Sequence, residues 1–403
     1  MIIDHLRSDH FALAACGAVC RAWLPSSRSR LLHSLELRPH TSEEFLGLLD
    51  SPFTTIPPYV RSLSIYGAAT RRGEEPSSWM DDTLPHLACL VRVQSLRLCE
   101  FCWRDLRAKS RNALISSFLQ VTELSLTYFS FDKFEGLVEL LCSYPSLEHI
   151  YFGDVFWPEG PSLASTSKRL PACFRHLDLG ICPKEDLIEA LFSHSTSAVD
   201  TVFLSYITMQ QVRPIAVFLR NLGHNLHHLR MDFIDLQVEE IGVQILSASL
   251  YYEPQPYCIV ESFCNVLDLV HNDQLRSIRL RDKFRSLVGG KLDMDRLAGI
   301  LSQIVSDRIE LVELAITPRF LHIIDLIDWS PLAKVFAKPK FAALRLIRIT
   351  VSGRTIQEVA DLVRKALPDC DARGILDFPR DLDSRPAQLF LKNIILEGMP
   401  DSQ

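Results

Sequence analysis

A six-residue pattern of hydrophobic and polar positions recurs along this 403-residue chain. Its form is apolar-x-x-apolar-x-apolar, in which the last apolar positions alternate with polar ones as in a half-buried strand. Five consecutive intervals between pattern starts, from Val93 to Leu226, are 25 to 28 residues long. A fixed period of this length indicates a repeat architecture. The pattern starts at Leu32, Val60, Val93, Val121, Leu147, Phe174, Val199, Leu226, Leu275, Leu311 and Leu344.

Segments with helical periodicity lie between these predicted strands. A capping-box sequence from Thr41 to Glu44 predicts the start of a helix that includes Phe45 to Leu49. Strand–helix alternation with right-handed crossovers predicts a parallel sheet. At this period we expect an α/β fold, a curved solenoid whose helices lie outside the sheet. The other predicted helices cover residues 103–119, 131–142, 184–192, 209–222, 238–250, 294–305 and 355–367.

The repeat resembles the leucine-rich-repeat fold, in its longer helix-bearing class, over roughly Leu31 to Thr350. The standard repeat carries Asn or Cys eight residues after its first leucine, where the side chain caps a ladder of backbone hydrogen bonds. Cys182 alone conforms at the eleven equivalent positions. The resemblance therefore implies a solenoid without a regular asparagine ladder. We expect an insertion after Leu226 with a loop at residues 251–256, and further loops at 70–78 and 158–167.

The first residues predict a short helical segment. Asp9 is the expected N-cap of a helix that carries Leu13 and Trp23 and ends before Pro25. One interpretation is a cap that covers the open apolar end of the solenoid. The expected organisation is helices in residues 1–40, the solenoid in 41–353, and a capping helix with a tail in 354–403.

Residues 2–37 also resemble the second half of an F-box, with the motif Val-Cys-Arg-x-Trp at Val19 to Trp23. An F-box followed by degenerate leucine-rich repeats is a familiar combination in the F-box families of mushroom-type fungi, and the chain resembles them in this order of segments. The Leu-Pro-x-Glu opening of that box is not found before Ile2, which leaves three alternatives: a misassigned start codon, a fragment, or lost adaptor binding. The residues that the resemblance implies for binding a Skp-type adaptor are Ile3, Leu6, Leu13, Cys16, Val19, Cys20 and Trp23.

Composition and charge narrow the class of protein. Hydrophobic residues make up 47% and the net charge is −6, as in an ordinary folded chain, which argues against a general polyanion-binding protein. No run of 18 apolar residues occurs, which argues against an integral membrane protein. The 11 cysteines lack the spacing of a secreted disulfide scaffold, and no Asn-x-Ser/Thr sequon occurs. We therefore expect an intracellular protein, cytoplasmic or nuclear, with neither nucleic acid nor membrane as partner.

Catalytic motifs are not found in the sequence. There is no P-loop, G-x-G-x-x-G, H-E-x-x-H or G-x-S-x-G. Cys99 and Cys102 form a CxxC with His86 and Cys89 upstream, but no second ligand pair follows at zinc spacing. We interpret them as ordinary thiols. The sequence predicts a protein that is not an enzyme and that needs no metal and no cofactor.

The candidate binding residues lie on the sheet face that the motif side chains leave free. Arg230, Arg279, Arg281 and Arg348 would form a basic strip there, and arginine and aromatic residues are enriched in interface hot spots. The alternative is a solvated sheet face without a binding role. The residues predicted to bind a substrate protein are His149, Tyr151, His176, Asp178, Phe203, His228, Arg230, Arg279, Arg281 and Arg348.

The F-box resemblance implies a non-enzymatic substrate-recognition subunit of a Skp–cullin–F-box ubiquitin ligase. Its partners would be a Skp-type adaptor, the cullin complex and an unknown substrate protein. The alternative is a leucine-rich-repeat interaction scaffold with a vestigial F-box and no ligase association. A third hypothesis is a ligand sensor, in which the four arginines hold a polyphosphate or an acidic small molecule.

Overall fold

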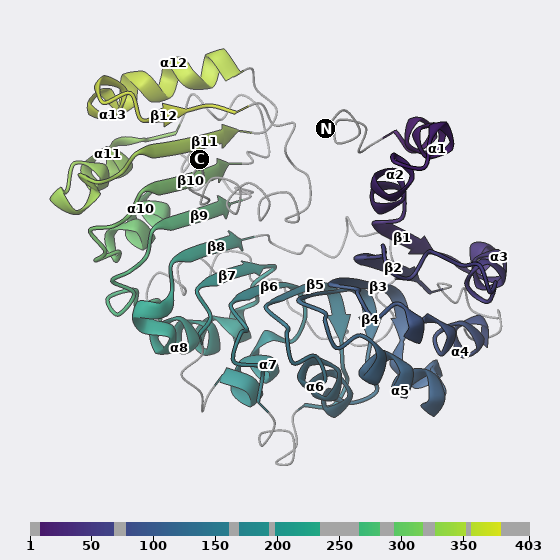
Figure 1. The fold of residues 1–403 in the computed structure, drawn as a ribbon. Helices are drawn as coiled ribbons and strands as arrows, with labels where there is room; N and C mark the ends of the chain where they lie inside the picture. Colours follow the sequence, from purple (N-terminus) through teal and green to yellow (C-terminus); the bar gives the residue numbers. More distant parts are fainter. Residues whose placement is uncertain are drawn as a thin grey trace. The chain divides into compact units, whose positions relative to one another are not determined.

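The computed structural model describes residues 9–67, 78–160, 169–192, 198–233, 266–282, 294–316, 327–351 and 356–379 (Figure 1). Its strands follow one another in the sheet in the order of the chain, and the pairs from β1 to β7 and from β9 to β12 are parallel. The strands are β1 Ser34–Leu37, β2 Ser62–Tyr66, β3 Ser95–Cys102, β4 Glu123–Ser130, β5 His149–Phe156, β6 His176–Ile181, β7 Thr201–Ser205, β8 His228–Phe233, β9 Ser277–Asp282, β10 Leu311–Ile316, β11 Leu346–Val351 and β12 Leu376–Asp377.

Helices connect most of these strands. The chain divides into two compact units, residues 1–228 with 265–272 (unit 1) and residues 229–264 with 273–403 (unit 2). The helices of unit 1 are α1 His10–Val19, α2 Leu24–Leu31, α3 Pro39–Leu49, α4 Ser78–Thr83, α5 Ala108–Ser117, α6 Phe134–Cys142, α7 Lys184–Phe192 and α8 Val212–Leu222. Those of unit 2 are α10 Asp295–Ser302, α11 Ser330–Phe336, α12 Ile356–Ala366 and α13 Pro368–Ala372.

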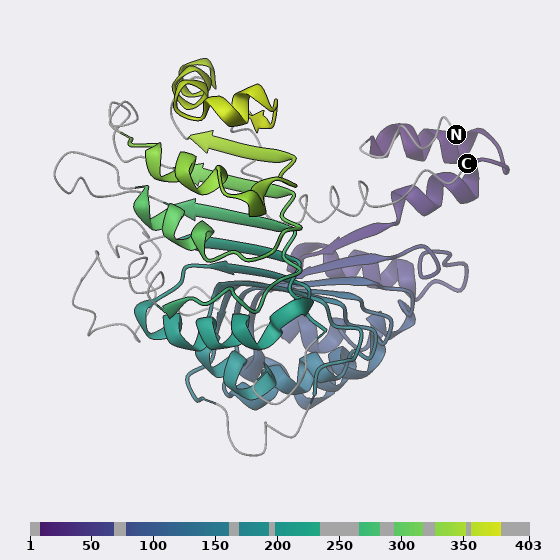
Figure 2. The ribbon, with the colours of Figure 1, turned by 90° about the vertical axis from the view of Figure 1, so that its left-hand side faces the viewer.

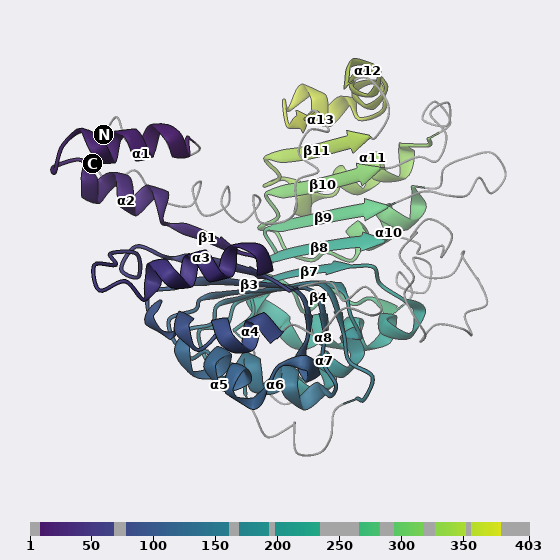
Figure 3. The same ribbon diagram turned by 90° about the vertical axis from the view of Figure 1, so that its right-hand side faces the viewer.

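In each unit the connecting helices cover one side of the strands. Figure 3 shows α4 to α7 on one side of the unit 1 strands, and Figure 2 shows the unit 2 helices against their own strands. Along β2 the buried side chains of Leu63 and Ile65 alternate with half-exposed serines and a tyrosine. The motif residues therefore face the helices, and the residues between them form what we call the inner face. This arrangement confirms the predicted leucine-rich-repeat-like α/β solenoid.

The sequence predicts that a regular asparagine ladder is absent, and in the structure varied side chains cap buried carbonyl groups instead. Tyr144 donates its hydroxyl hydrogen to the Leu114 carbonyl (3.0 Å), and Gln211 Nε2 donates to the Cys182 carbonyl (3.0 Å), each about one repeat away. Buried Lys184 donates to the carbonyl of Gly180 (2.6 Å). Buried carbonyl groups need such partners, so different side chain types meet the same requirement in successive repeats.

Several predicted boundaries were wrong. The predicted helix through Trp23 is two helices, because α1 ends at Val19 and α2 begins at Leu24, which places Pro25 in a first turn where proline is tolerated. Asp9 does cap α1, since its Oδ1 accepts a hydrogen bond from the Ala12 N–H (2.9 Å). The single predicted N-terminal helix is therefore a helical pair.

The capping box predicted at Thr41 is also wrong. Helix α3 begins one turn earlier, at Pro39, and the Thr41 hydroxyl accepts a hydrogen bond from the Arg38 N–H (3.1 Å) from inside the helix. The predicted helices 103–119 and 131–142 are shorter at their first residues, where Trp103–Asp105 forms a 3-10 turn and α6 starts at Phe134. By contrast, α7 has the predicted bounds, Lys184–Phe192.

The motif of β10 begins two residues earlier than predicted. Val312 lies opposite Ile278 and Ile347 in the register, so the motif residues are Ile309, Val312 and Leu314, and all three are fully buried. The run Ile309 to Ile316 offers two overlapping matches to the pattern, and strand pairing selects one. The predicted helix 238–250 and loop 251–256 lie outside the described residues, as do most of the predicted loops 70–78 and 158–167.

Backbone irregularities mark the ends of the unit 1 strands. Glu100, Tyr128 and Tyr206 have φ of 62°, 52° and 56°, a left-handed conformation that is uncommon outside glycine. Glu100 and Tyr128 each interrupt the alternation of their strands, and Phe101 lies opposite Phe129 beyond them. Such an inserted residue is the signature of a β-bulge, which bends the strand locally.

Candidate functional site

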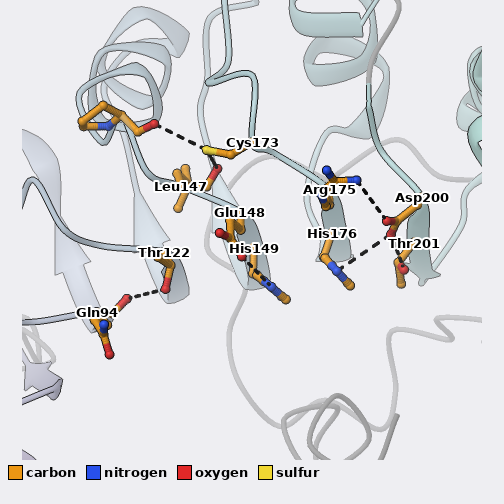
Figure 4. Close-up of polar contacts among 11 residues, drawn as sticks. Gln94, Thr122, Leu147, Glu148, His149, Cys173, Arg175, His176, Asp200 and Thr201 are labelled. Carbon is orange, nitrogen blue, oxygen red and sulfur yellow. Dashed lines mark hydrogen bonds and ion pairs between the residues drawn. The ribbon is translucent and has the colours of Figure 1, made fainter. Parts of the chain in front are cut away.

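The histidines predicted to bind substrate meet on the inner face of unit 1. His149 of β5 lies opposite His176 of β6 in the register, and their rings stack with centroids 4.0 Å apart and planes 8° from parallel (Figure 4). The Nδ1 atoms of both rings are buried and have no hydrogen-bond partner. The two histidines are 27 positions apart in the sequence, so a repeat of that length brings them together.

Carboxylates border this histidine stack. Asp200 Oδ1 lies 3.8 Å from His176 Nε2, and Glu148 Oε2 lies 3.8 Å from His149 Nε2. Arg175 Nη1 is 3.8 Å from the other Asp200 oxygen, and the Thr201 hydroxyl donates to Asp200 (2.8 Å), as Figure 4 shows. Asp200 is thus bound by three neighbours and is positioned at the edge of the stack.

The histidine stack is uncharged at neutral pH. Burial lowers the pKa of His149. Burial and the neighbouring His149 lower the pKa of His176 to about 4, although the Asp200 carboxylate opposes the shift. The cost of removing a charged ring from water therefore exceeds the attraction of a carboxylate 3.8 Å away. Two neutral rings can stack closely, whereas two protonated rings would repel each other.

A metal role for the stack does not fit its geometry. Parallel rings direct their Nδ1 lone pairs side by side in separate planes, so one ion cannot lie in both planes. Within the described residues no group of three or more His, Cys, Asp or Glu side chains is arranged to hold a metal ion. In the predicted CxxC, burial raises the pKa of Cys99, which keeps the thiol protonated.

The other inner-face residues of unit 1 differ in exposure. Tyr151 and Asp178 are half-buried and lie opposite each other on β5 and β6. Phe203 lies opposite Asp178 on β7, which confirms its inner-face position, but its side chain is only 5% exposed. The sequence suggested an accessible aromatic residue there, and in the structure Phe203 is buried. His228 is half-buried at the start of β8.

The predicted arginines lie on the inner-face positions of unit 2, but three of them have carboxylate partners. Arg279 Nη2 lies 3.3 Å from Glu313 Oε1, and their side chains are 19% and 5% exposed. Burial, followed by the charge of Arg230, lowers the pKa of Arg279, although the Glu313 carboxylate opposes the shift. This pair joins β9 to β10 across the inner face.

Arg230 and Arg348 are paired with carboxylates as well. Arg230 donates from Nε and Nη2 to the two oxygens of Asp232 (3.1 and 2.8 Å), and Arg348 Nε donates to Asp377 (2.9 Å). The expected basic strip is therefore a row of mixed charges. Sequence reasoning omitted Glu313 and Asp377 from the candidate residues. A signal for Glu313 existed, because it occupies the position in β10 that Arg279 occupies in β9.

The predicted adaptor-binding residues are distributed over α1, α2 and their connection. Leu13 is fully buried, so its side chain packs within unit 1, and Cys16 is half-buried. Val19 and Trp23 are 67% and 40% exposed, and Cys20 is exposed as well. Ile3 and Leu6 lie outside the described residues.

No protein-family model matches the chain, and no curated protein does. Among solved structures, the chain is similar to a leucine-rich-repeat protein of Leptospira interrogans, with 11% sequence identity and a TM-score of 0.24. The match covers 88% of this chain and 92% of the other. The fold assignment rests on the strand order and burial described above. In the described part of the chain, no helix has the length and apolar character needed to cross a membrane.

Proposed function

We propose that this chain is a non-enzymatic protein-interaction module that acts as the substrate-recognition subunit of a Skp–cullin–F-box ubiquitin ligase. The observation that supports the proposal best is the exposure of large apolar side chains on the N-terminal helical segment. Phe11 is 91% exposed, Val19 67% and Trp23 40%. Val19 and Trp23 belong to the Val-Cys-Arg-x-Trp motif that resembles an F-box.

Three exposed apolar residues within thirteen positions favour a partner surface over a simple cap. A cap would turn its apolar residues toward the repeat that it covers. Helices α1 and α2 pack against each other, and a Cβ at Gly17 would lie 3.5 Å from Leu24 Cδ1. Gly17 therefore lies close to α2, while the side chains of Val19 and Trp23 remain exposed for a partner.

In this proposal the inner face of the solenoid binds the protein to be ubiquitylated. The chain would act by holding that protein close to a ubiquitin-charged conjugating enzyme, which raises the effective concentration of the reacting groups. No side chain of this chain takes part in the chemistry, and no metal or cofactor is needed. The proposed role belongs in the cytoplasm or the nucleus.

The test is co-purification of the full chain with a recombinant Skp-type adaptor. We expect a stable complex, and we expect Val19→Asp and Trp23→Ala each to weaken it by tenfold or more, as for interface hot spots. Phe53→Ala is the matched control, because Phe53 is an 89% exposed apolar residue outside the helical pair. Binding that is absent in the wild type, or equal in Val19→Asp and Phe53→Ala, would contradict the ligase role.

A second candidate is an interaction scaffold without ligase association. The observation that favours it is the complete burial of Leu13, which uses one of the residues implied for adaptor binding in internal packing. Affinity purification from cells separates the two candidates. Recovery of protein partners that depend on the inner face, without any adaptor or cullin, would support the scaffold.

A further inference from the structure

Cross-strand partners distinguish one arginine of unit 2 from the others. In the register of β9 and β10, Arg279 lies opposite Glu313, and Arg281 lies opposite Ala315. The first pair forms an ion pair of 3.3 Å. Opposite Arg279, strand β10 supplies the Glu313 carboxylate. Opposite Arg281, it supplies only the methyl group of Ala315.

A second carboxylate of unit 2, that of Asp232, is already bound. Both oxygens of Asp232 accept hydrogen bonds from the Arg230 guanidinium, in a fork that uses Nε and Nη2. Within the described part of the chain, Arg281 takes part in no ion pair, and its Nε is buried without a hydrogen-bond partner. The side chain of Arg281 is nevertheless only partly exposed.

A partly buried guanidinium without a counter-ion is an unfavourable arrangement. The group is always protonated, so it cannot escape the cost of desolvation by losing its charge. Its planar fork of N–H donors matches a carboxylate or a phosphoryl group and binds either in a bidentate manner. The positive charge of Arg281 also reaches Arg279, where it contributes to the lowered pKa of that guanidinium. An added anion at Arg281 would therefore offset the desolvation of this guanidinium.

We propose that Arg281 binds an anionic group, a carboxylate or a phosphoryl group, carried by an acidic segment of the partner protein. The segment would lie on the inner face of unit 2, where Arg281 would receive from the partner the negative charge that Ala315 does not supply. The inference rests on the proposed role as a protein-interaction module and names the chemistry of the partner. It does not depend on whether the module belongs to a ubiquitin ligase.

The test measures binding of three probes by isothermal titration calorimetry, at constant ionic strength. The probes are a hexaglutamate peptide, a peptide with three phosphoserines, and inorganic phosphate. We expect the wild type to bind at least one of the two peptides more tightly than inorganic phosphate. Arg281→Gln should lose about tenfold or more in affinity, since a charge-assisted bidentate contact is removed.

Two further variants make the test specific. Arg276→Gln removes an exposed arginine just before β9 and should bind as the wild type does. Ala315→Glu keeps Arg281 but places a carboxylate opposite it, as Glu313 is placed opposite Arg279, so peptide binding should fall as in Arg281→Gln. The melting temperatures of Arg281→Gln and Ala315→Glu report folding, and Arg281→Gln should melt no lower than the wild type because it loses an unpaired charge.

Several outcomes would overturn the inference. The first is that neither peptide binds. The second is that Arg276→Gln loses as much affinity as Arg281→Gln. The third is that Ala315→Glu is folded and binds the peptides as tightly as the wild type does. Binding of inorganic phosphate alone would reject a partner segment as the source of the anion. Failure of adaptor binding through Val19 and Trp23 is a separate result, because those residues lie in unit 1, and it would leave the peptide result unchanged.

Discussion

The inner faces of the two units pair residues across neighbouring strands in chemically different ways. In unit 1, His149 and His176 occupy neighbouring strands as a neutral ring stack, with Asp200 at its edge. In unit 2, Arg279 and Glu313 occupy neighbouring strands as a half-buried ion pair. One register relation, residue opposite residue on parallel strands, therefore supports either aromatic stacking or charge pairing.

The comparison shows which positions of the repeat are constrained. The core positions of both units carry fully buried Leu, Ile and Val, as at Leu63 in β2 and Val312 in β10. The inner-face positions are constrained only by the side chain opposite, so each strand pair meets that requirement with its own residues. The backbone differs as well, because the described part of unit 2 has a left-handed residue only at Gly374, whereas unit 1 has three that are not glycine.

Removal of Glu313 should have the largest effect on this comparison. Glu313→Ala removes the carboxylate that lies 3.3 Å from the half-buried Arg279, and we expect a loss of about 4 kcal/mol in the free energy of unfolding. Urea unfolding followed by circular dichroism measures the change. Asp307→Ala, at an exposed position of the same unit, should change stability by less than about 0.5 kcal/mol.

The double variant Arg279→Met/Glu313→Leu sharpens this result. It replaces both charges with apolar groups, and we expect it to recover most of the stability lost in Glu313→Ala. If the double variant were as unstable as the single one, the loss in Glu313→Ala would come from the missing ion pair itself. It would not come from the cost of leaving the Arg279 charge buried. A loss below 1 kcal/mol in Glu313→Ala would mean that the pair is not desolvated.

A smaller effect is expected from closing the space between the unit 1 strands. A Cβ at Gly180 would lie 2.4 Å from the Phe152 carbonyl oxygen of the neighbouring strand. Gly180→Ala therefore forces β5 and β6 apart, and we expect a loss of about 3 kcal/mol in the free energy of unfolding. Gly47→Ala is the control, because no atom lies within 4 Å of its Cβ position in α3. It should stabilise the protein by about 0.5–1 kcal/mol, and equal effects of the two variants would refute the close approach.

The histidine stack predicts a pH dependence of stability in unit 1. The pKa of His176 is about 4 in the folded chain, below the value of 6.5 for an unperturbed histidine, so the unfolded chain binds the proton first as pH falls. Stability is therefore fully present above pH 6.5 and is lost as pH falls toward 4, by about 3 kcal/mol for this group.

His176→Phe tests this prediction, because phenylalanine keeps a ring in the stack but does not titrate. Urea unfolding at pH 7 and pH 4.5 should show a smaller acid-induced loss in His176→Phe than in the wild type. The exposed His40 provides the control variant His40→Gln, which should lose as much stability on acidification as the wild type does. An unchanged acid-induced loss in His176→Phe would show that other groups cause it.

The sequence predicted the elements that depend on local patterns. The bounds of α7 and the buried motif positions follow from apolar periodicity, which depends only on nearby residues. The split between α1 and α2 was not predicted. Pro25 is nevertheless a signal for it, because proline is favoured in the first turn of a helix. For β10, the two overlapping matches from Ile309 and Leu311 were equivalent in the sequence, and only pairing with β9 and β11 separates them.

The repeat, its period and the residues that face the helices follow from the amino-acid pattern alone, because each hydrophobic side chain must be buried wherever its strand lies. Which inner-face residues meet depends on how the strands pair in the folded chain. His149 contacts His176, Arg279 contacts Glu313, and Arg281 lies opposite Ala315, although each pair is 27 or more positions apart. These relations depend on the register between strands. Two residues along β9 on the same face, the arginine lies opposite an alanine and not opposite a glutamate. Whether the inner face carries a basic strip or a row of mixed charges was therefore a property of the folded chain.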